Sequence, residues 1–147
     1  MTKRFLLISC VFGAAAVILG AFGAHVLGKI LSEADLKIYQ TAVQYHFYHT
    51  FAIMGTALIS RYSSKKWSNI AGWLFTFGII FFSGSLYLMS VAYAFEFESM
   101  RPILGPITPL GGVMFIGGWM SLLFSATRYK ERSKVKNKSK STVSEAV

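Results

Sequence analysis

Three histidines are the residues of this 147-residue chain with the most versatile chemistry. An imidazole can bind a metal ion, exchange a proton near neutral pH or hold a hydrogen bond. His46 and His49 are three positions apart, which places them on adjoining parts of one helix face. If His25 lay alongside, the three rings could share a zinc ion, because Zn²⁺ accepts imidazole nitrogen. The spacing therefore admits a three-histidine metal site.

A hydrogen-bonded structural role for these histidines is favoured over a metal site. Ligand histidines are usually oriented by a carboxylate, and the apolar segments described below contain no Asp or Glu. Polar side chains in a membrane usually face the interior of a helix bundle. The candidate polar cluster, placed in the outer half of the membrane by the topology below, is His25, Tyr45, His46, Tyr48, His49, Ser83, Ser85, Tyr87 and Thr108. We predict no metal and no cofactor, with small-molecule, quinone or proton handling as the alternative.

Four long segments without Asp, Glu, Lys or Arg must position this cluster. They cover residues 5–28, 38–60, 67–95 and 102–127, with lengths of 24, 23, 29 and 26 residues. About 20 helical residues cross a hydrocarbon core of about 30 Å. The sequence therefore predicts an all-α, four-helix membrane bundle with spans at about 5–27, 42–61, 69–95 and 109–129. Residues 1–129 form this domain, and the Lys- and Ser-rich segment 130–147 is expected to be a disordered basic tail.

The distribution of charge predicts the orientation of the bundle. With the N-terminus in the cytoplasm, 12 of the 15 Lys and Arg residues lie on the cytoplasmic side. The three outside are Lys29, Lys37 and Arg101, beside the acidic residues Glu33, Asp35, Glu96 and Glu98. Because basic loops are retained in the cytoplasm, both termini are predicted to be cytoplasmic. The net charge of +9 is then a topology signal, and no nucleic-acid binding is expected.

Small residues predict where the helices approach one another closely. In lipid, rows of small residues let helix backbones pack by dispersion forces. The predicted packing residues are Gly13, Ala16, Gly20 and Ala24 in the first span, Gly84 in the third, and Gly111 and Gly118 in the fourth. Two helix starts are also predicted: Ser32 caps a helix from Glu33 to Ser60, and Thr108 caps a helix that begins at Pro109. Three prolines, Pro102, Pro106 and Pro109, predict a break in this segment before the helix starts.

Several function classes lack their usual signals in this sequence. It contains no P-loop, no HExxH and no nucleophile elbow. Carboxylates are missing from all four predicted spans, which argues against a proton pump of the usual kind. The one cysteine, Cys10, cannot form an intramolecular disulfide.

Four motifs together resemble a known family of membrane proteins. They are GAFGAH at 20–25, YHFYH at 45–49, FSGSLY at 82–87 and ITPLGG at 107–112. In order and spacing they resemble the domain of unknown function 423 family, to which the eukaryotic transmembrane protein 256 looks related. The resemblance implies a four-span protein of the bacterial cytoplasmic (inner) membrane with no established activity. It also implies that His25 and His49 match family positions, whereas position 46 usually carries Gln.

These observations predict a non-enzymatic, multi-pass membrane component that contacts the lipid bilayer. It is expected to act through helix contacts with another membrane protein or with a second copy of itself. The alternative is a small transporter or a ligand- or quinone-binding protein that uses the His and Tyr cluster. A metal- or haem-dependent redox enzyme is the third and least favoured class.

Overall fold

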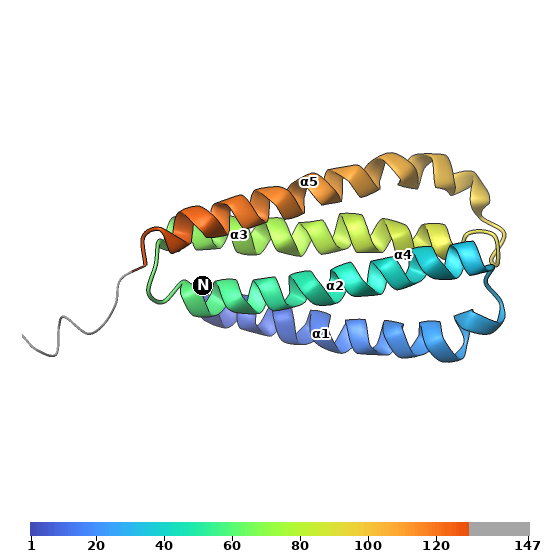
Figure 1. Cartoon of the computed structure of the whole chain (residues 1–147), viewed down its shortest axis with the longest axis horizontal. Coiled ribbons are helices and arrows are strands. Elements are labelled where there is room, and N and C mark those ends of the chain that lie inside the picture. Colours follow the sequence, from blue (N-terminus) through green and yellow to red (C-terminus); the bar gives the residue numbers. More distant parts are fainter. Residues whose placement is uncertain (130–147) are drawn as a thin grey trace, which may run out of the picture.

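The computed structural model describes residues 1–129, which form four antiparallel helical rods (Figure 1). The elements are α1 (Thr2–His25), η1 (Leu27–Lys29), α2 (Glu33–Ile59), α3 (Lys65–Gly78), the π-helical η2 (Ile79–Ser83), α4 (Gly84–Val91), η3 (Glu98–Met100) and α5 (Arg101–Ala126). The elements α3, η2 and α4 follow one another without a break and form the third rod. The predicted all-α four-helix bundle is confirmed. The predicted tail lies outside the described residues.

The rods pack in the order α1, α2, α3–η2–α4 and α5, as Figure 1 shows. The helix α1 packs mainly on α2, and α2 packs on α3, η2 and α4. The helix α5 packs along the other side of α3, η2 and α4 and touches α2 only sparingly. The core between the rods includes Phe5, Ile53, Phe75, Ile79 and Phe115. Because α2 and α5 both rest on the third rod without closing on each other, a groove remains between them.

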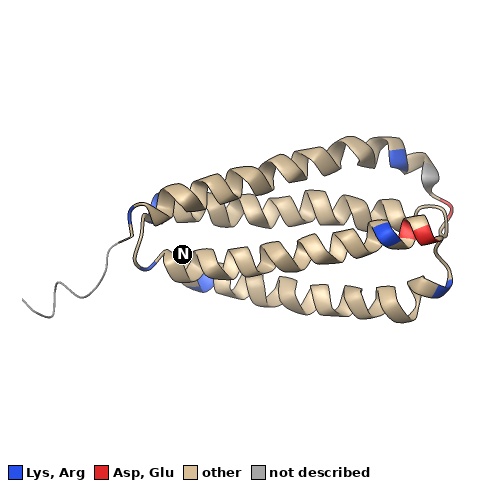
Figure 2. Cartoon of the chain, viewed as in Figure 1, with Lys and Arg blue, Asp and Glu red and all other residues tan. Residues whose placement is uncertain are grey.

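Charged residues lie at the two ends of the rods, with an uncharged middle (Figure 2). The acidic residues that the structure describes gather at one end, and the N-terminus and the end of α5 lie together at the other. Within residues 1–129, three helices are long and apolar enough to cross a membrane: Thr2–Lys29, Lys65–Val91 and Arg101–Ala126. The helix α2 is more polar, and its buried polar residues are Asp35, His46, His49, Thr50 and Thr56. Its role as a fourth span, and the cytoplasmic position of both termini, stay predictions.

The start of α2 shows how local sequence fixes a helix end. The side chain of Ser32 accepts a hydrogen bond from the backbone N–H of Asp35 at 3.1 Å. Glu33 and Asp35 lie in the first turn, where negative charge is favoured by the helix dipole. The helix runs from Glu33 to Ile59, which agrees with the helix predicted from the cap.

The start of α5 differs from the prediction. The helix begins at Arg101, with Pro102 in the first turn, where a missing N–H costs nothing. Pro106 and Pro109 lie inside the helix, so neither can donate the usual hydrogen bond to the carbonyl four residues earlier. The predicted break in this segment and the predicted helix start at Thr108 are wrong. Packing against α4 explains the difference, because Thr108 lies within the helix and hydrogen-bonds to Ser85 of α4 at 2.7 Å.

Two of the predicted packing glycines lie at close helix contacts. A Cβ atom added to Gly111 would lie 2.8 Å from the Cα of Phe82, and one added to Gly118 would lie 2.6 Å from the Phe75 ring. Two glycines that the prediction omitted are as tight, because Gly72 receives the ring of Phe5 and Gly78 receives that of Phe115. These glycines let α5 and α1 lie close to the third rod.

The remaining predicted packing residues fall into two groups. Ala16 is fully buried, and a Cβ atom on Gly13 or Gly20 would make ordinary contacts of 3.7 and 3.5 Å with α2. Ala24 is exposed, and a Cβ atom on Gly84 would meet nothing within 4 Å. These last two residues do not mark close contacts between rods, because they face outward from the bundle.

Candidate functional site

His49 lies at mid-length in the bundle and has different partners on its two ring nitrogens. Its Nδ1 lies 2.9 Å from the Tyr45 carbonyl oxygen, which can only accept, so Nδ1 carries the proton. Its Nε2 lies 3.4 Å from the indole Nε1 of Trp119, which can only donate. The ring is therefore neutral. Its acceptor atom, Nε2, receives only a long and weak hydrogen bond. Phe115 stacks on the imidazole, with ring centroids 3.4 Å apart and planes 7° apart.

The groove between α2 and α5 surrounds this imidazole. It has a volume of about 520 Å³ and is lined by Tyr45, His49, Phe82, Pro109, Gly112, Val113, Phe115, Ile116 and Trp119. Val113 and Ile116 are 64% and 66% exposed, so the groove opens on the outer surface of the rods, where lipid lies. The lining is largely aromatic and aliphatic, and His49, Tyr45 and Trp119 supply its polar atoms. A pocket of this size and composition suits a small apolar ligand.

His46 is three residues away but faces other rods. Its Nδ1 lies 3.3 Å from the hydroxyl of Tyr87 in α4, and the ring of Phe12 in α1 meets it edge-on. Its Nε2 is buried without a well-formed hydrogen bond among the described residues. Tyr87 packs against Tyr39, whose hydroxyl donates to the Leu19 carbonyl of α1 at 2.7 Å. These contacts tie α1, α2 and α4 together.

The other predicted cluster members are divided among separate places. Ser85 and Thr108 pair at 2.7 Å between α4 and α5. The Ser83 hydroxyl is buried without a partner among residues 1–129. Tyr48 and His25 are both exposed. The structure thus places the nine residues in several small contacts along the rods instead of one outer-leaflet cluster.

The three histidines do not come together. His25 is at the end of α1, whereas His46 and His49 are the fourteenth and seventeenth of the 27 residues of α2. Within residues 1–129 there is no group of three His, Cys, Asp or Glu side chains that could hold a metal ion. The geometry therefore gives no support to the three-histidine zinc site that the spacing admits.

An ion pair that the sequence did not predict lies at the end that holds the acidic residues. Arg101 of α5 donates to Asp35 of α2 at 2.9 Å and lies over the ring of Tyr93 at 4.4 Å. The second carboxylate oxygen of Asp35 accepts from the Ser32 hydroxyl at 2.8 Å. The sequence indicated that residues of opposite charge lie on the same side of the membrane. It did not indicate which of them pair, because Asp35 and Arg101 are 66 residues apart.

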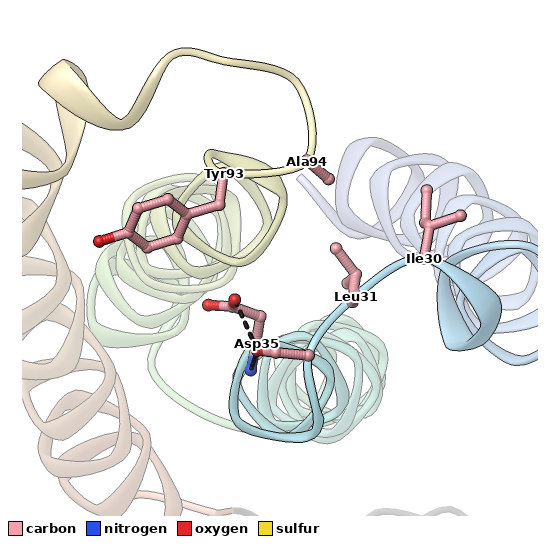
Figure 3. A pocket seen from close by; sticks show the side chains of 6 residues that line it. Ile30, Leu31, Asp35, Tyr93 and Ala94 are labelled. Carbon is pink, nitrogen blue, oxygen red and sulfur yellow. Dashed lines mark hydrogen bonds between the residues drawn. The ribbon is translucent and has the colours of Figure 1, made fainter.

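A pocket of about 470 Å³ lies beside this ion pair (Figure 3). Tyr93 and Ala94 lie on one side, Ile30 and Leu31 on the other, and Asp35 between them. Arg101 and Ser32 pair with the two carboxylate oxygens, so the charge of Asp35 is already balanced by Arg101. The pocket is best explained as the gap left where two loops meet.

Serine hydroxyls join the rods at the opposite end of the bundle. Ser125 of α5 lies 2.7 Å from Ser68 of α3 and 2.8 Å from Ser63 of the connecting turn. Thr2 at the start of α1 pairs with Ser60 at 3.1 Å. Both ends of the bundle are therefore closed by polar contacts, and the groove lies between them.

Comparison with known proteins places the chain in a family. Residues 19–112 match the model of the family described as a protein of unknown function (DUF423). The chain belongs to the DUF423 family. It is 41% identical over 128 residues to the UPF0382 membrane protein YwdK of Bacillus subtilis, covering 86% of this chain and 98% of that protein. It is 36% identical over 133 residues to the UPF0382 inner membrane protein YgdD of Escherichia coli, covering 90% and 96%. No solved structure matches the chain.

The names of the relatives and the apolar helices show where this protein resides. The name of the Escherichia coli relative and the three apolar helices make it a helical protein of the inner membrane, in contact with the lipid bilayer. The matched family segment contains His46, His49 and Phe82 and ends at Gly112, before Phe115 and Trp119. The family description gives no activity, and kinship with the eukaryotic protein stays a prediction.

Proposed function

We propose that this DUF423 protein is a non-enzymatic membrane component that works by packing α1 against another transmembrane helix. That helix belongs to a second copy of the chain or to another membrane protein. The supporting observation is a row of exposed, mostly small residues on α1: Leu7, Cys10, Ala14, Val17, Ala21 and Ala24. Their spacing alternates between three and four, which is the seam spacing of paired helices.

The row suits a partner helix better than it suits lipid. The buried residues of α1 are Phe5, Ser9, Ala16 and Gly23, which lie on a different face. Alanine and cysteine let a second backbone approach closely, so that dispersion and weak polar contacts accumulate along the seam. Bulkier exposed residues, Val11 and Ile18, lie seven positions apart along one side of the row. A partner helix would therefore pack on the smaller side chains beside them.

The interior supports a structural role. The pairs His46–Tyr87, Ser85–Thr108 and Ser68–Ser125 each join two rods. The first two pairs use four of the nine side chains of the candidate polar cluster. Hydrogen bonds of this kind keep the rods of the bundle in fixed positions. A protein that works by presenting one helix face to a partner needs such a fixed structure.

Replacing two alanines of the row with the larger leucine tests this proposal. In native membranes solubilised gently, Ala14→Leu combined with Ala21→Leu should shift the protein on a native gel from a complex to the size of a single chain. The matched control, Val11→Leu with Ile18→Leu, alters the neighbouring exposed face and should leave the complex intact. A wild-type protein that migrates as a single chain, or a complex unaffected by either pair, would contradict the proposal.

A further inference from the structure

We propose that the groove between α2 and α5 binds a lipid-soluble ring compound of the quinone class. The inference goes beyond the packing role of α1, because α1 contributes no residue to the groove lining. The ring of the ligand lies among the aromatic side chains, and its oxygen atoms meet His49, Trp119 and Tyr45.

The aromatic walls of the groove suit a flat ring. Tyr45 and Phe82 have ring centroids 4.6 Å apart, and Phe82 and Phe115 have centroids 5.5 Å apart. These side chains come from three rods, and Phe82 belongs to the π-helical turn, a feature frequent at functional sites. Aromatic rings gain most from offset or edge-on contact with other rings. The groove therefore offers ring surfaces on more than one side.

The polar atoms of the groove suit a compound with hydroxyl or carbonyl oxygens. The His49 Nε2 is an acceptor, and its hydrogen bond from Trp119 is long at 3.4 Å. The Tyr45 hydroxyl has no hydrogen-bond partner among residues 1–129, and the Tyr45 side chain is 38% exposed. A hydroxyl of the reduced ring can donate to Nε2, whereas a carbonyl of the oxidised ring can accept from the indole N–H or from Tyr45. The site can thus bind either form, and no electron transfer is part of the proposal.

The same atoms disfavour two other occupants. A phospholipid acyl chain has no group that could pair with His49, Trp119 or Tyr45. A transmembrane helix has its backbone groups already paired and is about 10–12 Å wide, so it would lie across the mouth of the groove. A ring compound with polar oxygens and an apolar tail matches both the aromatic walls and the polar atoms of the groove. It can enter the groove directly from the lipid.

Binding of decylubiquinone to the full chain in lipid nanodiscs tests the proposal. The readout is quenching of tryptophan fluorescence, because Trp119 lines the groove. Wild type should show a saturable component. Gly112→Leu fills the groove and should weaken binding by about tenfold or more. Gly112 tolerates a side chain, because its added Cβ would make only ordinary contacts of 3.8 Å with Phe82.

Two further variants separate binding from folding. Gly55→Leu adds the same side chain where an added Cβ meets nothing within 4 Å, and binding should stay within about twofold of wild type. His49→Phe keeps an aromatic ring against Phe115 but removes the Nε2 acceptor, so binding of the reduced probe should weaken by about tenfold. If Gly112→Leu fails to fold, the binding measured for His49→Phe still tests the proposal.

Three results would overturn the proposal. The first is quenching that rises linearly with probe and is equal in wild type and Gly112→Leu, which means partition into lipid only. The second is equal binding of the reduced probe, decylubiquinol, by wild type and His49→Phe. The third is a disulfide between two copies carrying Ile116→Cys in a Cys10→Ser background, which would show that a second chain occupies the groove.

Discussion

The two ring nitrogens of His49 make different hydrogen bonds, and the imidazole also stacks on the ring of Phe115. Nδ1 donates to the Tyr45 carbonyl, whereas Nε2 accepts weakly from Trp119. His25, by contrast, is exposed at the end of α1. Residue type alone does not distinguish these histidines. What distinguishes them is the set of neighbours that distant parts of the chain bring to each one.

Alanine at these two positions should therefore have unequal effects on stability. His49→Ala removes a buried stacked ring and leaves the Trp119 indole unpaired, so the free energy of unfolding should fall by about 2–4 kcal/mol. His25→Ala should change it by less than about 0.5 kcal/mol. Thermal unfolding in detergent measures both. Equal losses would mean that His25 is paired inside the bundle.

At the scale of the elements, the contacts of α5 decide its shape. Helix propensity and three prolines argue against a helix before Pro109, yet α5 begins at Arg101 and packs along the third rod. The ring of Phe115 lies on Gly78, and Gly111 lies against the Phe82 backbone. Packing over the whole length of the helix outweighs the lost hydrogen bonds of Pro106 and Pro109.

Two glycines of α5 give a matched test of this packing. Gly111→Ala would place a Cβ atom 2.8 Å from the Cα of Phe82, and overpacking of this kind costs about 1–3 kcal/mol. Gly105→Ala meets nothing within 4 Å and should be neutral or stabilising by up to about 1 kcal/mol, because Ala is the better helix former. The unfolding temperature should fall in Gly111→Ala and should stay the same or rise in Gly105→Ala. A stable Gly111→Ala protein would mean that α5 lies farther from η2.

The ion pair between α2 and α5 can be tested by exchanging its charges. Asp35→Arg or Arg101→Asp alone places like charges where the side chains are 12% and 22% exposed, so each should lower the unfolding temperature. The double variant restores opposite charges and should recover part of the loss. Additive losses in the double variant would show that the two residues are not coupled.

For the whole molecule, the sequence predicted the class of fold and much of its detail. Charge-free segments predicted four helices, and the Ser32 cap predicted the start of α2, because both signals are local. The groove could not be predicted in this way. It depends on Trp119 meeting His49 across 70 residues, and on α2 and α5 lying apart on the third rod. Such distances follow from packing, which no local pattern in the chain specifies.

The orientation in the membrane remains a prediction from charge and has a direct test. Single cysteines at Ser64 and Ser99 in a Cys10→Ser background report the two ends of the bundle. With both termini cytoplasmic, an impermeant thiol reagent should label Ser99→Cys in intact cells and Ser64→Cys only after the cells are opened. Labelling of Ser64→Cys alone in intact cells would invert the orientation.

The packing role of α1 is the central claim, and site-specific photo-crosslinking in native membranes tests it most directly. A photoreactive residue replaces Ala14, in the exposed row, or Ile18, which is 68% exposed beside it. A protein product at position 14, identified by mass spectrometry as a second copy or another membrane protein, together with little or none at position 18, is the predicted result. Products of equal yield at both positions, or no protein product at position 14, would contradict it.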